Sequence, residues 1–574
     1  MPDSETAAQA RLDLDRWRDH AQLNSLEGDP FLRQLLLRHL GDGWRESEPR
    51  LHQVATAAGS DLDSWVNECN LDENLPRLKG EDALGRPTEE VRFHPSHHEA
   101  GRIFWGSGVL SVLKQPGQEV LAGAIAYLLD QHGEAGHACP VACTAGAIKL
   151  LQRLGTDRQR SRYLPGLLES DYDRRLHAAQ FVTEVQGGSD VGLNACRAIP
   201  DPELPDHYRI FGEKWFCSVA DAELFVVSAR LPEAAMGTRG LGLFLVPRRV
   251  DGKVNGFRLR RLKNKLGTRS MPTGEIEFDG ALAEPIGPLD QGFKNLVGIV
   301  LDTSRVHNAL AACGIMRRAF VEAQSYARER YAFEHRIQDF PGVQQILARM
   351  KVRTMASLAT TFRILAISDR LDTIGPDEDL SGARRIAVMI NKYWTAVAAT
   401  HTARDGIELL GGNGTIEDFS VLPRLYRDAI VVESWEGTHN TLCAQVLRDF
   451  AARGLHSNWL RLLSSEIEEL THARVQPFTV TARNLHHEVV HRIERLSSAD
   501  ETSAAACIRH VVDRMCHLTD WLALSAQAQW EADRNLETDT GDALDLYRML
   551  FLDATDPQET PRLISLQHRL GSGL

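Results

Sequence analysis

The sequence lacks any apolar run long enough to span a bilayer, so we expect no membrane span. It is also poor in cysteine: nine residues scattered over 574 positions favour the reduced, mostly buried thiols of a cytoplasmic protein over a disulfide framework. The N-terminus, MPDSETAAQARLDLDRW, lacks the basic and apolar character of a targeting segment. Basic residues are not in excess either, because the net charge is −13. This charge argues against a general polyanion-binding role, and we expect no DNA binding.

Two common nucleotide-binding motifs are missing as well. Neither GxGxxG nor a Walker A sequence occurs anywhere in the chain. The sequence therefore gives no support to a Rossmann or P-loop nucleotide site.

The length of the chain predicts several domains, because 574 residues are too many for one hydrophobic core. Long helical patterns flank a central stretch of short segments that are rich in β-branched and aromatic residues and separated by Gly, Pro and Asp. We therefore predict an α+β multidomain fold. Its expected parts are an N-terminal extension (1–90), an N-terminal helical domain (91–178), a β-domain (179–287), a C-terminal helical bundle (288–452) and an additional helical domain (453–574).

The segment Arg424–Asn440, RLYRDAIVVESWEGTHN, contains a carboxylate in an apolar setting. Glu436 follows Trp435 directly and precedes Gly437. Apolar neighbours raise the pKa of a carboxylate towards the range of a general base, and the glycine lets the backbone approach a ligand closely. A partly buried structural glutamate beside a turn explains the same pattern, so the residues alone leave both interpretations open.

Two further patterns contain possible metal ligands. The first comprises His94, His97, His98 and Glu99, which a capped helix start after Pro95 explains as well as a metal site does. The second, His487-Glu488-Val489-Val490-His491, has the HExxH spacing of zinc proteases. No third ligand follows at a familiar distance, so we favour a solvated helix face and predict no metal.

The motifs LLGGNG, LPRLYRD and WEGTHN occur in this order, and together they resemble the C-terminal signature of the acyl-CoA dehydrogenase family. The order FHP, EAG, CP further upstream resembles the AidB branch of that family. The resemblance covers roughly residues 90–450. It implies a helical domain, a β-barrel-like domain and a helical bundle, to which this chain adds an extra C-terminal helical domain. It also implies FAD as cofactor, an acyl-CoA substrate, an electron-transfer flavoprotein or similar acceptor, and a homo-oligomer (dimer or tetramer).

The resemblance also implies the roles of individual residues. It makes Glu436 the catalytic base. In the β-domain it assigns flavin contacts to Val182, Thr183, Gly188, Ser189, Phe216 and Ser218. In the helical bundle it assigns flavin contacts to Arg330, Phe333, Leu409, Gly411, Gly412, Thr438 and Asn440. It assigns substrate contacts to Asp302, Arg305 and Gly437. Arg330 would reach the flavin pyrophosphate across a subunit interface.

Three positions depart from the common family pattern. Pro341 replaces a glutamine whose amide contacts the flavin, Glu408 replaces a glutamine before LLGGNG, and Asn440 stands where glutamine is usual. Pro341 and Asn440 resemble the AidB branch. Ser304 lies near the position from which some relatives supply the base on another helix. A serine cannot act as that base, so Glu436 is the one candidate.

The implied reaction is α,β-dehydrogenation of an acyl-CoA thioester in fatty acid metabolism. Glu436 would take the α-proton, and the flavin would accept the β-hydrogen as hydride. Two other functions remain open from the sequence. One is a nucleic-acid-associated protective flavoprotein, as the AidB resemblance suggests. The other is a protein that sequesters acyl-CoA with little turnover.

Overall fold

The computed structural model of the chain describes residues 4–21, 26–553, 555 and 561–572. The chain divides into two compact units. The sheet unit comprises Asp61–Gln115 and Glu134–His307. The helical unit comprises Met1–Ser60, Pro116–Gly133 and Asn308–Leu574.

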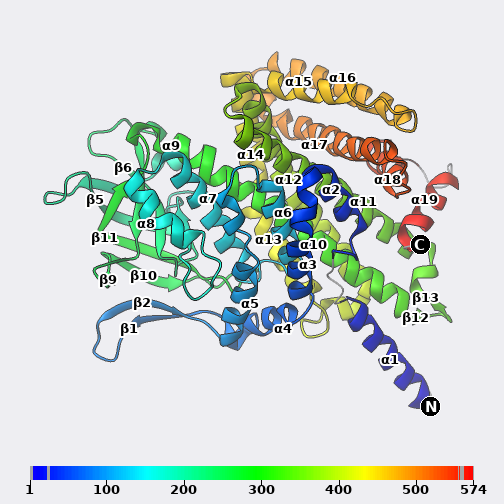
Figure 1. Ribbon diagram of the computed structural model, residues 1–574, viewed down its shortest axis with the longest axis horizontal. Helices are drawn as coiled ribbons and strands as arrows, with labels where there is room; N and C mark the ends of the chain where they lie inside the picture. The colour runs from blue at the N-terminus through cyan, green and yellow to red at the C-terminus, as the bar shows by residue number, and fades with distance from the viewer. Residues whose placement is uncertain (1–3, 22–25, 554, 556–560, 573–574) are drawn as a thin grey trace. The chain divides into compact units, whose positions relative to one another are not determined.

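The sheet unit is built on one seven-stranded sheet (Figure 1). Its strands are β3 (Ala178–Phe181), β4 (Arg197–Pro200), β5 (Tyr208–Ser218), β6 (Leu224–Arg230), β7 (Leu241–Pro247), β10 (Phe257–Leu262) and β11 (Thr273–Pro285). The strand order is β10-β11-β5-β4-β6-β3, and β7 pairs with both β11 and β6. The pairings β11-β5-β4-β6-β7-β11 therefore close into a ring, which agrees with the predicted β-barrel-like domain.

The sequences of the central strands explain their burial. β6, LFVVSAR, and β7, LGLFLVP, are apolar along their lengths rather than alternating, and all their residues except Arg230 are buried. Such runs are typical of strands that are covered on both faces. The longest pair is antiparallel β5 and β11, in which Ser218 lies opposite Thr273 and Cys217 opposite Gly274.

Helices and a hairpin surround this sheet. They are α4 (Leu62–Cys69), α5 (Pro95–Gly106), α7 (Ala138–Leu154), α8 (Asp157–Leu167), α9 (Gly292–Asn295) and the antiparallel pair β1 (Arg77–Glu81) and β2 (Pro87–Arg92). α7 is tied to β3 because the backbone N–H of Ala178 donates to Oγ1 of Thr144 at 3.0 Å. α5 begins at Pro95, and the His94 side chain accepts from the backbone N–H of Ser96, as expected for a capped helix start.

The helical unit contains the long helices of the chain. Those before the LLGGNG motif are α1 (Ser4–Ala21), α2 (Pro30–Leu40), α3 (Trp44–Ala58), α6 (Glu119–Asp130), α11 (Pro341–Ile374) and α12 (Glu378–Leu410). Those after it are α13 (Leu422–Ser434), α14 (His439–Arg453), α15 (Leu455–Glu468), α16 (Gln476–Ser497), α17 (Glu501–Ala532), α18 (Thr540–Tyr547) and α19 (Pro561–Ser572). α10 (Asp302–Glu329) begins in the sheet unit and continues into the helical unit.

The C-terminal helices share a core with the bundle rather than standing apart from it. α15, α16 and α17 run side by side (Figure 1), and α17 and α19 pack on α11. The buried carboxylate of Asp520 on α17 accepts hydrogen bonds from Thr360 on α11 (2.7 Å), Trp394 on α12 (2.8 Å) and Tyr547 on α18 (3.2 Å). Four helices therefore meet at one buried polar group.

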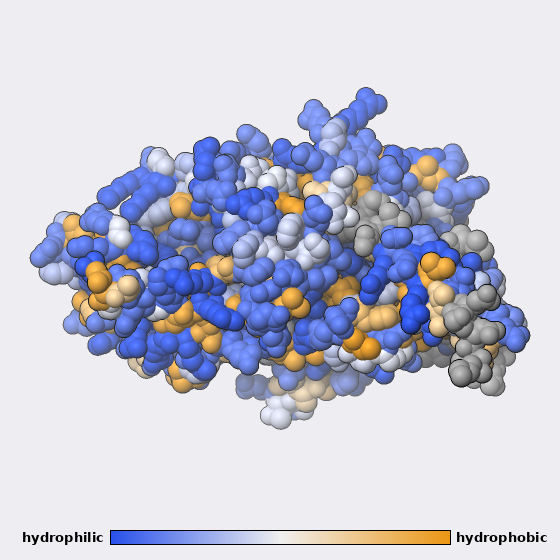
Figure 2. Space-filling model, turned by 90° about the horizontal axis from the view of Figure 1, so that it is seen from below, coloured by the Kyte–Doolittle hydropathy of each residue, from blue (hydrophilic) through white to orange (hydrophobic). Residues whose placement is uncertain are grey.

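The surface is mostly polar where it can be seen. On the face drawn in Figure 2, hydrophilic side chains predominate and apolar ones occur in small groups. Among the described residues, no helix combines the length and the hydropathy that crossing a membrane requires.

Candidate functional site

The loop that carries Glu436 is a short connection in the helical unit. It follows α13, which ends at Ser434, and precedes α14, which begins at His439. Glu436 has a φ of 57° and Gly437 a φ of 102°, so both lie in the left-handed region. Glycine adopts this region at little cost, whereas a glutamate is held there only by its surroundings. Such strain is typical of functional sites.

Two buried side chains on neighbouring helices donate hydrogen bonds to this loop and to the end of α13 before it. Nζ of Lys392, on α12, donates to the backbone oxygens of Glu433 (3.0 Å) and Gly437 (2.9 Å). Nδ2 of Asn308, on α10, donates to the backbone oxygen of Val432 at 3.1 Å. Neither residue could be predicted from the sequence, because neither belongs to a motif that points to this chemistry.

A second carboxylate near the loop is already engaged. Oε2 of Glu433 lies 2.7 Å from Nε2 of His439. Although burial opposes ionisation, hydrogen bonds from His439 and Thr400 hold the pKa of Glu433 below its usual value. A carboxylate with a lowered pKa is a weaker base, so Glu433 is a poor candidate for a general base.

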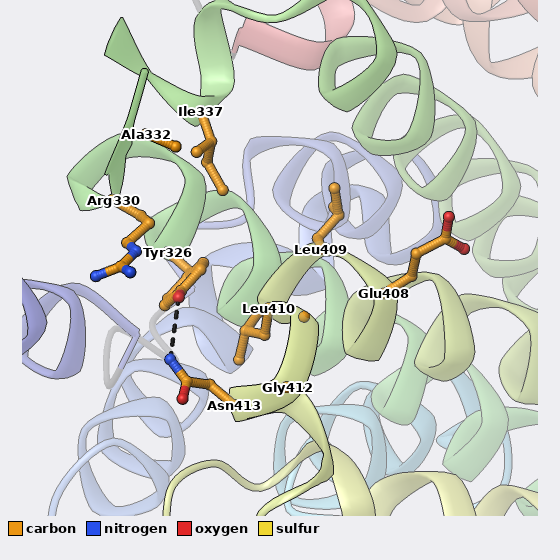
Figure 3. A pocket seen from close by; sticks show the side chains of 10 residues that line it. Tyr326, Arg330, Ala332, Ile337, Glu408, Leu409, Leu410, Gly412 and Asn413 are labelled. Carbon is orange, nitrogen blue, oxygen red and sulfur yellow. Dashed lines mark hydrogen bonds between the residues drawn. The ribbon is translucent and has the colours of Figure 1, made fainter. Parts of the chain in front are cut away.

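A cleft of about 330 Å³ lies elsewhere in the same unit. Its lining residues are Tyr326, Arg330, Ala332, Ile337, Glu408, Leu409, Leu410, Gly411, Gly412 and Asn413. The Nδ2 of Asn413 donates to the Tyr326 hydroxyl at 3.2 Å, and Figure 3 shows the Glu408 carboxylate directed away from Arg330. The structure thus brings four predicted flavin contacts together, namely Arg330, Leu409, Gly411 and Gly412. It adds Tyr326 and Asn413, which were not predicted from the sequence.

The chemistry of this cleft suits a phosphate group. A Cβ added at Gly411 or Gly412 would meet no atom within 4 Å, so both glycines leave open space beside their backbone. Arg330 contributes a guanidinium, which binds phosphate oxygens in a charge-assisted fashion. The cleft thus contains a guanidinium and an open glycine backbone, which are the kinds of group that bind the pyrophosphate of a flavin dinucleotide.

The predicted contact Phe333 lies at the turn of a hairpin next to this cleft and is not among its lining residues. The hairpin joins β12 (Tyr331–Ala332) to β13 (His335–Arg336), and Phe333 and Glu334 at its turn both have positive φ, 52° and 68°. The Phe333 side chain is 89% exposed, which is unusual for so large an apolar group. Pro341, which replaces the glutamine of the common family pattern, is the first residue of α11. The backbone N–H at this position has no acceptor within the helix, so a proline there loses no helical hydrogen bond.

Two predicted residues at the start of α14 are exposed. Thr438 is the residue before the helix and its Oγ1 lies 3.0 Å from Oγ1 of Thr441. Asn440 lies in the first turn of the helix. Both flank the Glu436 loop on its C-terminal side, so they lie beside Glu436 rather than at the cleft.

In the sheet unit, the predicted flavin loop is fastened to β5. The backbone N–H of Trp215 donates to the oxygen of Thr183 at 2.9 Å, which ties Thr183 to the strand that also carries Phe216 and Ser218. A Cβ at Gly188 would lie 2.8 Å from Oγ1 of Thr183, so only glycine allows this approach without a shift.

The polar and aromatic side chains of this loop and strand face solvent in part. Ser189 is exposed and Phe216 is 53% exposed, whereas Val182 is half-buried. Nζ of Lys263 lies 3.5 Å from the ring centre of Trp215 and 4.8 Å from that of Phe216. The half-exposed Phe216 ring leaves part of its surface accessible to a planar ligand.

The start of α10 carries Asp302 and Arg305, which were predicted to contact substrate. A π-helical turn (Leu296–Leu301) precedes them, and such turns occur frequently at functional sites. Arg305 is buried and Asp302 half-buried. Ser304 between them is buried, and Nε2 of Gln180 donates to its Oγ at 2.9 Å. The position near which some relatives carry a base is therefore occupied by a serine hydroxyl that already accepts a hydrogen bond.

The HExxH segment lies on α16 with both histidines, His487 and His491, exposed. The Glu488 carboxylate pairs with Arg492 (2.8 Å) and Arg514 (2.6 Å), which lower the pKa of that carboxyl although burial opposes the effect. Within the described ranges, no three His, Cys, Asp or Glu side chains gather into a possible metal site.

Three domain families match successive parts of the chain. The adaptive response protein AidB N-terminal domain matches residues 17–174, the acyl-CoA dehydrogenase middle domain matches residues 179–281, and the acyl-CoA dehydrogenase C-terminal domain matches residues 290–450.

Individual proteins match over most of their length. Acyl-CoA dehydrogenase family member 11 of Caenorhabditis elegans is 33% identical over 466 residues, which are 78% of this chain and 73% of that protein. The putative acyl-CoA dehydrogenase AidB of Escherichia coli is 32% identical over 409 residues, 69% of this chain and 72% of that protein. The crystal structure of C. elegans ACDH-11 in complex with C11-CoA has a TM-score of 0.82 at 25% identity, with 96% of this chain and 91% of that chain covered.

Proposed function

The chain belongs to the acyl-CoA dehydrogenase family, and we propose that it catalyses the FAD-dependent α,β-dehydrogenation of an acyl-CoA thioester. Membership confirms the predicted resemblance, its AidB branch, the α+β multidomain fold and the expectation of an oxidoreductase. The observation that carries the proposal of activity is the conformation of Glu436, a carboxylate held in the left-handed region beside Gly437.

Glu436 is proposed as the general base that takes the α-proton. An α-proton beside a thioester is weakly acidic, so the thioester oxygen must be stabilised as it gains charge. The backbone N–H of Glu436 is proposed to donate a hydrogen bond to that oxygen, and Gly437, which lacks a Cβ, would let the acyl chain approach closely. Glu433, held by His439, stays outside the reaction.

FAD contacts are proposed in each unit by itself. In the helical unit, Arg330, Gly411 and Gly412 would hold a pyrophosphate group. In the sheet unit, Phe216 and Ser218 would contact a flavin ring. When bound, the flavin supplies the acceptor for the β-hydride, which no amino-acid side chain can supply. An electron-transfer flavoprotein or a similar acceptor would then remove the electrons.

A homo-oligomer, a dimer or a tetramer, is proposed to complete the site. The support is Phe333, because an apolar side chain that is 89% exposed at a turn with positive φ gains from cover by a second subunit. A cytoplasmic location is proposed as well, since none of the nine cysteines, all of which lie in described parts of the chain, forms a disulfide.

Identification of co-purified ligands tests this proposal. The protein is purified without added cofactor, its visible spectrum is recorded, and small molecules released by denaturation are identified by mass spectrometry. We expect a flavin spectrum, FAD and at least one acyl-CoA. Colourless protein that cannot be reconstituted with FAD would refute the proposal. The search for released acyl-CoAs should include an 11-carbon chain, because ACDH-11 was solved with C11-CoA.

A further inference from the structure

A lysine fully buried in the bundle bridges the loop that carries Glu436. Lys392 on α12 is 0% exposed, and its Nζ donates to the backbone oxygens of Glu433 at 3.0 Å and Gly437 at 2.9 Å. Glu433 lies in the last turn of α13, and Gly437 follows Glu436 directly. One ammonium therefore holds the chain on both sides of Glu436.

This bridge explains why the backbone of Glu436 adopts a left-handed conformation. The carbonyls in the last turn of a helix have no partner within the helix, and a lysine favours that end because of the helix dipole. Drawing the oxygen of Gly437 to the same nitrogen as the oxygen of Glu433 makes the intervening chain fold back sharply. Glu436, with φ 57°, is the residue at which the chain reverses.

A buried ammonium is costly for a core that needs only packing. Removing a charged group from water costs several kcal/mol, on the order of the penalty known for buried ion pairs, and an apolar side chain of similar volume avoids it. α12 is otherwise buried along most of its length with aliphatic and small residues. A lysine at this position is therefore better explained by the loop that it holds than by the stability of the bundle.

We propose that Lys392 is a positioning residue for the dehydrogenation: it fixes the carboxylate of Glu436 in the geometry for α-proton removal without touching substrate or flavin. This inference rests on the proposed function of Glu436. A displacement of a reacting group by about 1 Å costs about 100-fold in rate, so the loss of this bridge should slow proton removal strongly while leaving ligand binding largely intact.

The test uses the holoprotein and anaerobic stopped-flow reduction of its flavin by butyryl-, octanoyl- and undecanoyl-CoA. Lys392→Met keeps the length of the stem and removes the donors. We expect its limiting rate of flavin reduction to fall about 10- to 100-fold, while its FAD content and the acyl-CoA concentration at half-saturation change less than about threefold. Lys392→Arg, which keeps the charge and the donors, should recover part of the rate.

Two controls separate positioning from general damage. Lys351→Met removes another lysine of the helical unit, one that pairs with Asp539 near the surface, and should reduce its flavin at the wild-type rate. In a Glu436→Gln background, adding Lys392→Met should change the residual rate by less than about twofold, because a residue that acts through Glu436 has nothing left to position.

The outcomes distinguish this inference from the function on which it rests. If no acyl-CoA reduces the wild-type flavin, the proposed dehydrogenation fails. If the wild type is reduced and folded Lys392→Met protein matches its rate, the positioning role is wrong. If Lys392→Met does not fold, the limiting rate of flavin reduction is measured for Lys392→Gln instead, because its shorter amide cannot reach both oxygens. A slowed limiting rate with retained FAD supports the role, and a wild-type rate overturns it.

Discussion

Lys214 and Glu184 form an ion pair in the interior of the sheet unit, with Nζ 2.7 Å from Oε1 and both side chains buried. Lys214 lies on β5, and Glu184 lies in the loop that opens with Thr183. The same carboxylate accepts from the backbone N–H groups of Ala195 (2.6 Å) and Cys196 (3.2 Å). This pair fastens the predicted flavin loop to the strand that carries Phe216 and Ser218.

Lys214→Met should destabilise the sheet unit, because it leaves the Glu184 carboxylate buried without its cation. Loss of one partner of a buried pair costs about 3–5 kcal/mol. The double variant Lys214→Met, Glu184→Leu should recover part of this loss, since both charges are then gone. Denaturant unfolding of the three proteins measures the effect. A single variant as stable as the wild type would contradict the structural role of the pair.

Asp520 should make stability depend on pH. Burial raises the pKa of its carboxyl from 3.8 to about 6, although hydrogen bonds from Thr360, Trp394 and Tyr547 oppose the shift. The folded state therefore holds this proton more tightly than the unfolded state. The contribution is fully present below about pH 4 and is lost as the pH rises through 6, by about 3 kcal/mol in total.

The comparison of wild type with Asp520→Asn isolates this effect, because other groups titrate equally in both. We expect the stability of the wild type to fall relative to that of the variant as the pH rises from 4 to 7. Denaturant midpoints measured across this range provide the test. A constant difference, or one that changes in the opposite sense, would be inconsistent with a raised pKa.

Arg330→Ala should weaken the retention of FAD, since it removes the guanidinium from the cleft that suits the pyrophosphate. A hydrogen bond to a charged group contributes about 1.5–3 kcal/mol, so the dissociation constant should rise about 10- to 100-fold. Arg336→Ala is the matched control on the same hairpin, where Arg336 contacts the Tyr331 hydroxyl. Titration of the apoprotein with FAD compares them. Equal losses in both variants would remove Arg330 from the site.

The protein should have no appreciable affinity for duplex DNA at physiological salt. Nonspecific DNA binding depends on Lys and Arg side chains that displace counterions. Residues 455–574 contain 11 Arg, no Lys and 18 Asp and Glu, so this region is acidic. Fluorescence anisotropy with a labelled duplex over a range of salt concentrations is the measurement. Micromolar binding with a steep salt dependence would show that a basic surface has been overlooked.

The motif residues could be found from the sequence because their chemistry is local. WEGTHN and LLGGNG combine a carboxylate or a backbone cradle with glycine, and the structure places Glu436 on a strained loop and Gly411 and Gly412 at a cleft. The alternation of short apolar segments with turn residues likewise predicted the β-domain. The hairpin of β1 and β2 was not expected, because its strands are rich in charged residues and carry no clear alternation.

The site residues that could not be predicted from the sequence are placed by tertiary contacts. Lys392 lies in a stretch of α12 that is buried on nearly all sides, so periodicity gives no reason to select it. Tyr326 and Asn413 line the cleft only because α10 and the LLGGNG turn meet there. The packing of the C-terminal helices on the bundle at Asp520 could not be predicted either. A helical pattern indicates which face of a helix is buried, but it does not indicate which helix covers that face.

The proposed role of Glu436 is tested most directly by anaerobic mixing of wild type and Glu436→Gln with a panel of acyl-CoAs while the flavin absorbance is followed. The substitution keeps size and hydrogen-bonding capacity and removes the basic lone pair. We predict that at least one acyl-CoA bleaches the wild-type flavin. None should bleach the flavin of the variant even after a time about 10²-fold longer than the wild type needs. Ligand-induced spectral shifts should persist in both proteins. Bleaching of the variant at the wild-type rate would contradict the assignment of Glu436 as the base.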